Sequence, residues 1–174
     1  MFNLLKLFFD IALLKKSPQD VPASLLLQRM IIAIYLFISI LLRIISENGF
    51  KVVLEVGVDL LFMFLFCRFI LFWVGKPKRF QQMFIALLGV DALISFCAFP
   101  AIATLNTPMP EKSSFFLLGI FSFIVLILWH WVAAGHIFHH ALSKPFIIGL
   151  GVALLYLMLS YQLNALLFSE IAME

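Results

Sequence analysis

The sequence predicts an all-α fold: a polytopic membrane bundle of five transmembrane helices preceded by an N-terminal interfacial amphipathic helix. Hydrophobic residues make up 64% of the 174 residues, charged residues make up 12%, and the mean hydropathy is +1.14. These values are typical of a chain surrounded mostly by lipid. A span needs about 20 residues, which leaves room for roughly five helices and short loops. We therefore expect one membrane domain over residues 1–174, without a separate soluble catalytic domain.

The N-terminal segment, residues 2–16, has the sequence FNLLKLFFDIALLKK and is too short to span a bilayer. Lys6 and Asp10 stand four residues apart and mark a polar stripe, which is typical of a helix lying along the membrane surface. Asp10 interrupts the apolar run and no small-residue cleavage site follows, so we expect the segment to be retained. Pro18 and Pro22 then interrupt the helix.

Five apolar stretches follow, separated by turn-forming residues. The third ends near Phe99, or near Leu105 if Pro100 only kinks it. Cys67 and Cys97 fall inside apolar stretches, where we interpret them as packing residues instead of disulfide partners or zinc ligands. The predicted spans cover approximately residues 25–45, 52–74, 83–105, 115–140 and 146–168.

The loop charges predict the orientation of the chain, because basic residues gather on the cytoplasmic side of membrane proteins. With five spans the two termini lie on opposite sides, and the loop charges place the N-terminus in the cytoplasm and the C-terminus outside. The tryptophans Trp73, Trp129 and Trp131 then all fall at cytoplasmic ends of spans, where indole rings favour the headgroup region. The cytoplasmic side receives Lys6, Lys15, Lys16, Lys76, Lys78, Arg79 and Lys144, whereas the other side receives only Lys51 and Lys112.

The charged residues inside the spans sort by depth into two layers. The inner layer, near the cytoplasmic side, holds Arg29, Arg68, Asp91 and His130, and the outer layer holds Arg43, Glu55 and Asp59. An unpaired charge in a bilayer costs several kcal/mol, so these groups should face the bundle interior and one another. We expect Asp91 to pair with Arg68 or Arg29. Arg43 should reach Glu55 across the short first loop, with Asp59 one helical turn deeper.

Three interpretations of these layers are open. They can be structural pairs that fix the order and register of the helices. The excess of arginine in the inner layer can form a cationic site for an anionic lipid headgroup or for an acidic residue of a partner helix. Asp91 and His130 can also belong to a proton pathway, although such relays generally use more titratable groups.

The stretch from Phe115 to His140 carries all four histidines of the chain. His136 stands three residues from His139 and four from His140, so a pair could chelate a metal from one helix face. A closed site needs further ligands, however, and no other span contains a histidine, which also excludes a haem between two histidine-bearing helices. We therefore expect no metal and no cofactor. The three residues should form a solvated cytoplasmic helix end.

Known catalytic motifs are missing from the sequence. It has no glycine-rich phosphate loop, no G-x-S-x-G elbow and no H-E-x-x-H motif. Asp59 and Asp91 lie in different layers, which argues against a paired-aspartate protease. The basic residues are scattered among loops, which argues against nucleic-acid binding. We expect the protein not to be an enzyme.

The stretch from Trp129 to Lys144, WHWVAAGHIFHHALSK, resembles the end of the fourth span in the Yip1-like family of five-span membrane proteins. The order of an N-terminal amphipathic segment and five spans resembles this family as well. The acidic and glycine-containing motifs of its earlier spans are not found here. The segment ALLKKSPQDVPAS is similar to the start of uncharacterised bacterial inner-membrane proteins. The resemblance implies a non-enzymatic bundle that acts through partners within the membrane. We expect a bacterial inner membrane, in which the orientation given by the loop charges places the C-terminus in the periplasm.

The sequence thus favours an accessory, scaffold or assembly subunit that contacts other proteins through its helices. Its expected partners are the lipid bilayer, another membrane protein or a second copy of itself, and an anionic lipid. The alternative is a small carrier or channel that moves a lipid, an ion or a small solute past the charged layers. A continuous polar path between the layers favours the carrier, and a dry midplane favours the subunit.

Overall fold

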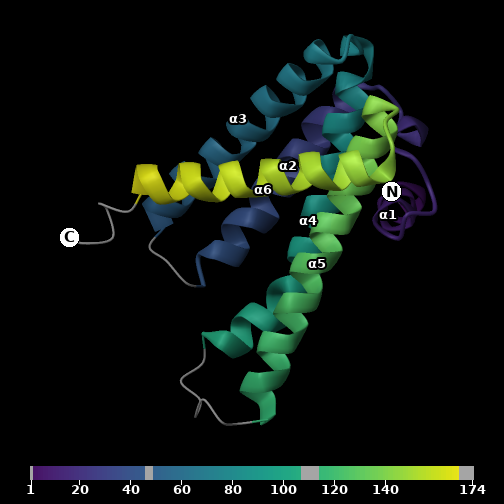
Figure 1. The fold of residues 1–174 in the computed structure, drawn as a ribbon. Coiled ribbons are helices and arrows are strands. Elements are labelled where there is room, and N and C mark those ends of the chain that lie inside the picture. Colours follow the sequence, from purple (N-terminus) through teal and green to yellow (C-terminus); the bar gives the residue numbers. More distant parts are fainter. Residues whose placement is uncertain (1, 46–48, 107–113, 169–174) are drawn as a thin grey trace.

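The computed structural model describes residues 2–45, 49–106 and 114–168, and these ranges contain helices and turns but no strand (Figure 1). Five of the helices are long and apolar enough to cross a membrane, which identifies a multi-pass membrane protein. The α-helices are α1 (Phe2–Ala12), α2 (Leu25–Arg43), α3 (Gly49–Trp73), α4 (Phe80–Leu105), α5 (Ser114–Leu142) and α6 (Phe146–Phe168), and the short 3₁₀ helices are η1 (Pro18–Asp20) and η2 (Pro77–Arg79).

The helix bounds extend some of the predicted spans. Helices α3 and α4 each begin three residues before the predicted spans. The predicted spans follow the apolar residues, whereas the first turn of each helix also contains polar ones. Helix α4 continues through Pro100 to Leu105, so the proline lies inside the helix. Lys112 and the C-terminal residues, which the charge count places outside, fall beyond the described residues.

Local sequence sets the turns between the helices. The Ser17 side chain accepts from the backbone N–H of Gln19, and the backbone N–H of Ser17 donates to Asp20, which together cap η1. Ser24 caps α2 in the same way. Gly75 ends α3 with a positive φ of 71°, which glycine adopts without strain.

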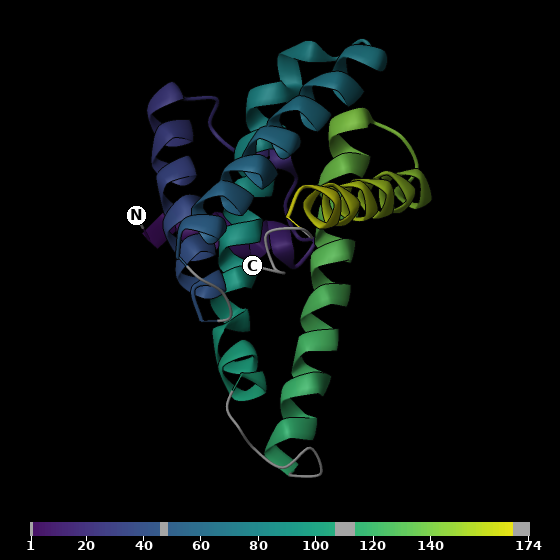
Figure 2. The same ribbon diagram turned by 90° about the vertical axis from the view of Figure 1, so that its left-hand side faces the viewer.

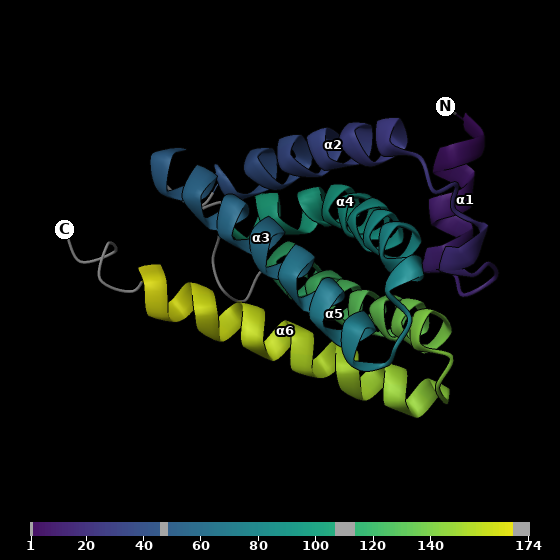
Figure 3. The same cartoon turned by 90° about the horizontal axis from the view of Figure 1, so that it is seen from above.

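Helix α4 lies at the centre of the bundle. Every residue from 83 to 90 is buried, and α4 packs against α1, α2, α3 and α5. Helices α4 and α5 form a hairpin, α2 packs against α4, and α6 crosses α5 (Figure 2; Figure 3). Polar side chains between these helices face a hollow instead of a packed core.

Helix α6 crosses α5 steeply, and glycine permits the close approach (Figure 1). A Cβ atom on Gly149 would collide with the carbonyl oxygen of Gly135 and lie 2.8 Å from the backbone nitrogen of His139. A Cβ atom on Gly135 would lie 3.1 Å from Cα of Leu150. The two backbones therefore touch, as small residues allow in membrane helices.

Helix α1 packs against the bundle. Leu7, Phe8 and Ile11 are buried, and the Phe8 ring lies where a side chain at Gly89 of α4 would stand. Lys6 on the opposite face is exposed. The predicted N-terminal helix is therefore present over Phe2–Ala12, while its position on a membrane surface stays a prediction.

Candidate functional site

A cavity of about 640 Å³ lies among the five long helices. We call it the central cavity. Most of its lining residues carry charged, polar or aromatic side chains. Its lining residues are Tyr35, Ser39, Leu42, Arg43, Lys51, Glu55, Asp59, Asp91, Ser95, His130, Tyr156, Leu157, Ser160, Tyr161, Asn164, Ala165 and Phe168.

An ion-pair cluster forms the part of the cavity wall next to the α2–α3 turn. Glu55 and Asp59 stand four residues apart on α3, so both carboxylates face the same way. Arg43 Nη1 lies 3.2 Å from Glu55 Oε2, and Arg43 Nη2 pairs with Asp59 Oδ2. Lys51 Nζ lies 3.6 Å from Glu55 Oε1. The predicted Arg43–Glu55 pair is confirmed, and two cations face two carboxylates in this cluster.

Helix α6 adds hydrogen-bond donors to the cluster. Ser160 Oγ donates to Asp59 Oδ1 at 2.9 Å, and Asn164 Nδ2 donates to the same oxygen at 2.6 Å. Asn164 also donates to the backbone oxygen of Ser160 at 3.0 Å. These donors stabilise the negative charge of Asp59 without adding a charge of their own.

A second pair joins α4 and α5. His130 Nε2 lies 2.6 Å from Asp91 Oδ1, and both side chains line the cavity. The prediction that Asp91 pairs with Arg68 or Arg29 is wrong, because both arginines are exposed on the outside of the bundle. The hairpin of α4 and α5 brings His130 to Asp91 instead, and a depth estimate alone cannot show which helices are neighbours.

The two predicted layers meet in one cavity. Asp91 and His130 were expected in a separate inner layer, yet they share the cavity with the Arg43 cluster. Neutral polar residues, which give no charge signal in the sequence, complete the lining. They recur at a spacing of four residues: Ser39 follows Tyr35 on α2, Ser95 follows Asp91 on α4, and Ser160 and Asn164 follow Tyr156 on α6.

The other three histidines lie near the end of α5, where His139 and His140 are half-exposed and His136 is buried. His136 is only 7% exposed, and its Nε2 lies 2.9 Å from the backbone oxygen of Lys16. His139 Nδ1 contacts the backbone oxygen of Lys144, and the His136 and His140 ring centroids are 4.5 Å apart. The prediction of a solvated helix end is wrong for His136, because the segment between α1 and α2 folds back over α5. Among the described residues, no cluster of three or more His, Cys, Asp or Glu side chains could hold a metal ion.

Donors from other segments cover the last carbonyl oxygens of α5, and we call this the α5 cap region. Arg79 Nη1 lies 3.1 Å from the carbonyl oxygens of both His140 and Ala141, and Lys76 Nζ donates to that of Leu142 at 2.9 Å. Gln19 also donates to the carbonyl of His140. Desolvation and repulsion by Arg79 and Lys144 lower the pKa of Lys76 from its ordinary value.

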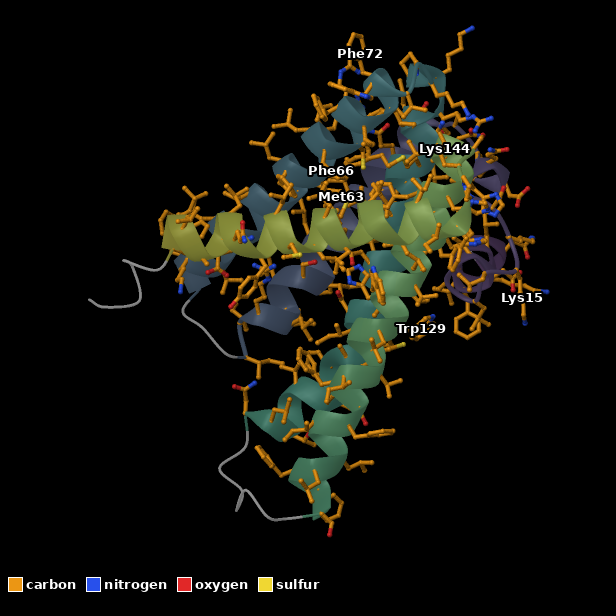
Figure 4. The ribbon with its side chains drawn as sticks, in the orientation of Figure 1. Lys15, Met63, Phe66, Phe72, Trp129 and Lys144 are labelled. Atoms are coloured by element: carbon orange, nitrogen blue, oxygen red, sulfur yellow. The ribbon has the colours of Figure 1, made fainter. Side chains whose placement is uncertain are left out.

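Trp129 ties α1 to α5. Trp129 is labelled on α5 in Figure 4. Its indole Nε1 donates at 2.8 Å to the backbone oxygen of Ala12, at the end of α1. The indole ring combines a large apolar surface with a single N–H donor. Trp129 can therefore pack between helices while it satisfies a carbonyl oxygen at the end of α1.

The side chains of the central cavity are suited to binding a polar molecule. Asp91 and His130 can share or exchange a proton, and the Arg43 cluster is already neutralised internally. Comparisons with models of known protein families, with curated proteins and with solved structures found no match. The resemblance to Yip1-like proteins therefore stays a prediction.

Proposed function

We propose that this protein is a non-enzymatic membrane carrier that binds a small polar solute in the central cavity. The supporting observation is that ionisable groups of both predicted layers line one hollow, together with neutral polar residues from α2, α4 and α6. Ionisable side chains inside a membrane protein are costly unless they pair or line a water-filled path. The predicted alternative of a small carrier is therefore favoured over a purely structural role for the charges.

The size of the cavity also supports this function. Small-molecule sites in proteins usually measure about 300–1,000 Å³. A volume of about 640 Å³ suits a solute of a few to about a dozen heavy atoms with its water. As part of this proposal, the protein lies in a bacterial inner membrane with its N-terminus in the cytoplasm and its C-terminus in the periplasm.

Thiol accessibility tests whether the cavity holds water. In a background with Cys67 and Cys97 replaced by alanine, Ser160→Cys and Ser95→Cys each place a thiol in the cavity wall. A membrane-impermeant maleimide reacts with the thiolate, which forms in water and not in lipid. We expect both variants to react in intact membranes.

Met158→Cys is the matched control. Met158 lies on α6 two residues before Ser160, is 53% exposed and does not line the cavity. Its thiol should face lipid and react slowly. If the cavity thiols react no faster than Met158→Cys, the cavity is dry and the carrier proposal fails. Reaction with reagent added from either side in turn would support transport, and reaction from one side only would contradict it.

A second proposal, the accessory subunit, rests on Arg29 and Arg68. Both side chains are exposed on the outside of the bundle, and Arg68 borders a hollow of about 280 Å³ beside Phe69 and Phe72. A cation in this position suits an acidic residue of a partner helix, a second copy of the chain or an anionic lipid headgroup. Purification in mild detergent followed by mass spectrometry tests it. Recovery of the protein alone and monomeric, without bound lipid, would contradict it.

A further inference from the structure

We infer that the solute of the central cavity is a small organic ammonium cation, bound between Asp91 and the tyrosine rings of the cavity wall. This inference rests on the proposed function, because it names the chemical class of the solute. It depends on three observations: the charge of the cavity, the free side of Asp91 and the aromatic lining.

The charges lining the cavity sum to minus one when His130 is neutral and to zero when it is protonated. Arg43 and Lys51 balance Glu55 and Asp59 in the ion-pair cluster. Among the residues that the structure describes, His130 is the one ion-pair partner of Asp91. The cavity therefore carries no net positive charge, which favours a cation over an anion.

Asp91 has room to accept a further donor. Its Oδ1 contacts His130, while its Oδ2 has no hydrogen-bond or ion-pair partner among the residues that the structure describes. The side chain is 18% exposed and lines the cavity. An ammonium group placed beside Oδ2 would gain a charge-assisted contact without breaking the pair with His130.

Aromatic rings line the same cavity as Asp91. They belong to Tyr35, Tyr156, Tyr161 and Phe168. The faces of aromatic rings attract cations, and quaternary ammonium groups in particular are bound by several rings at once. A carboxylate beside several rings is therefore suited to an ammonium group.

An anionic solute fits the same cavity poorly. Arg43 and Lys51 already face carboxylates, so an anion beside them would be repelled by Glu55 and Asp59. Asp59 is 7% exposed, and its displacement from Arg43 would leave a buried charge with only the neutral donors Ser160 and Asn164.

Ligand binding to the full-length protein in lipid nanodiscs tests the inference. Choline, ethanolamine and tetramethylammonium serve as cationic probes, with glycine betaine, glycerol and acetate as zwitterionic, neutral and anionic probes at the same ionic strength. We expect at least one cationic probe to raise the Tm and to bind in calorimetry, and the other three to bind more weakly or not at all.

Variants of Asp91 locate the binding. Asp91→Asn should weaken cation binding roughly tenfold or more, because the amide loses the charge and keeps the size of the side chain. Asp91→Glu should restore part of the affinity. Arg29→Gln, outside the cavity, is the matched control and should bind as the wild type does. The cationic probes on the wild-type protein test the inference even if Asp91→Asn fails to fold.

The outcomes separate this inference from the proposed function. Preferred binding of acetate, glycerol or betaine would overturn the ammonium assignment and leave the carrier proposal standing. If none of the three cationic probes binds at millimolar concentration while the cavity thiols react with aqueous maleimide, the ammonium assignment is overturned and the carrier proposal stands. A dry cavity in the thiol experiment would overturn both. Equal cation affinity in Asp91→Asn and the wild type would contradict the role of Asp91.

Discussion

The central cavity and the α5 cap region are both rich in polar side chains, but the side chains bind different things. In the cap region Arg79, Lys76 and Gln19 donate to backbone carbonyl oxygens at the end of α5. In the cavity Arg43 and His130 pair with carboxylates of other helices. The first set satisfies groups that every helix end leaves unpaired, whereas the second satisfies only other side chains.

This difference separates structural from functional polarity in a membrane bundle. The last carbonyls of a helix lack partners within the helix and need donors from water or from other segments. The fold therefore explains the donors of the cap region. No helix end requires Asp91 and His130, and the proposed function assigns them to a ligand. Four variants test this division, from the largest expected effect to the smallest.

The largest effect is expected at the α5–α6 crossing, next to the cap region. Gly149→Leu forces a side chain against the backbone of α5 and should prevent the crossing, with a loss of about 3 kcal/mol or more. Unfolding by denaturing detergent, followed by tryptophan fluorescence, measures it. Gly151→Leu is the control, because a Cβ atom there meets nothing within 4 Å. Equal stability of the two variants would show that α5 and α6 do not touch at Gly149.

Asp59 is the cavity residue whose loss should destabilise the protein most. Asp59→Ala leaves Arg43 with one carboxylate fewer and removes the acceptor of Ser160 and Asn164, so we expect a loss of about 3 kcal/mol. The same unfolding measurement applies. Asp59→Asn combined with Arg43→Gln should lose less, because neither charge is then left alone. A double variant no more stable than Asp59→Ala would argue against the pairing.

An intermediate effect is expected in the cap region itself. Arg79→Ala removes the donor shared by His140 and Ala141 and should cost about 1–3 kcal/mol. Lys78→Ala is the neighbouring control, since Lys78 is exposed, and it should stay within about 0.5 kcal/mol of the wild type. If Arg79→Ala is as stable as Lys78→Ala but no longer binds the solute, the structural role of the cap region is contradicted.

The smallest effect on stability is expected for Asp91→Asn. The amide oxygen can still accept from His130, so thermal unfolding should change by less than about 1 kcal/mol. A loss of about 3 kcal/mol would instead assign Asp91 to the structural pairs, as the sequence alone allowed. This variant therefore decides between the two interpretations of the cavity charges most directly.

The sequence predicted those features that depend on residues near in the chain. The five apolar stretches give five helices, and the short loop between α2 and α3 brings Arg43 to Glu55. The partner of Asp91 and the burial of His136 depend on which helices are neighbours and on how the segment before α2 folds back. Neither depth nor periodicity carries that information. The stripe of Tyr156, Ser160 and Asn164 was readable in principle, but neutral residues give no charge signal.

The steep crossing of α5 and α6 connects the shape of the cavity to the thickness of the bilayer. Helix α5 has 29 residues and is about 43 Å long, whereas the hydrocarbon core measures about 30 Å. Two helices that cross steeply can both span this core only if each tilts, and the Gly135–Gly149 contact lies where they meet. We expect a thicker bilayer to favour a smaller crossing angle, which would bring Ser160 and Asn164 toward α5. The maleimide reaction of Ser160→Cys should then slow as lipid chains lengthen, and an unchanged rate would contradict a link between membrane thickness and access to the cavity.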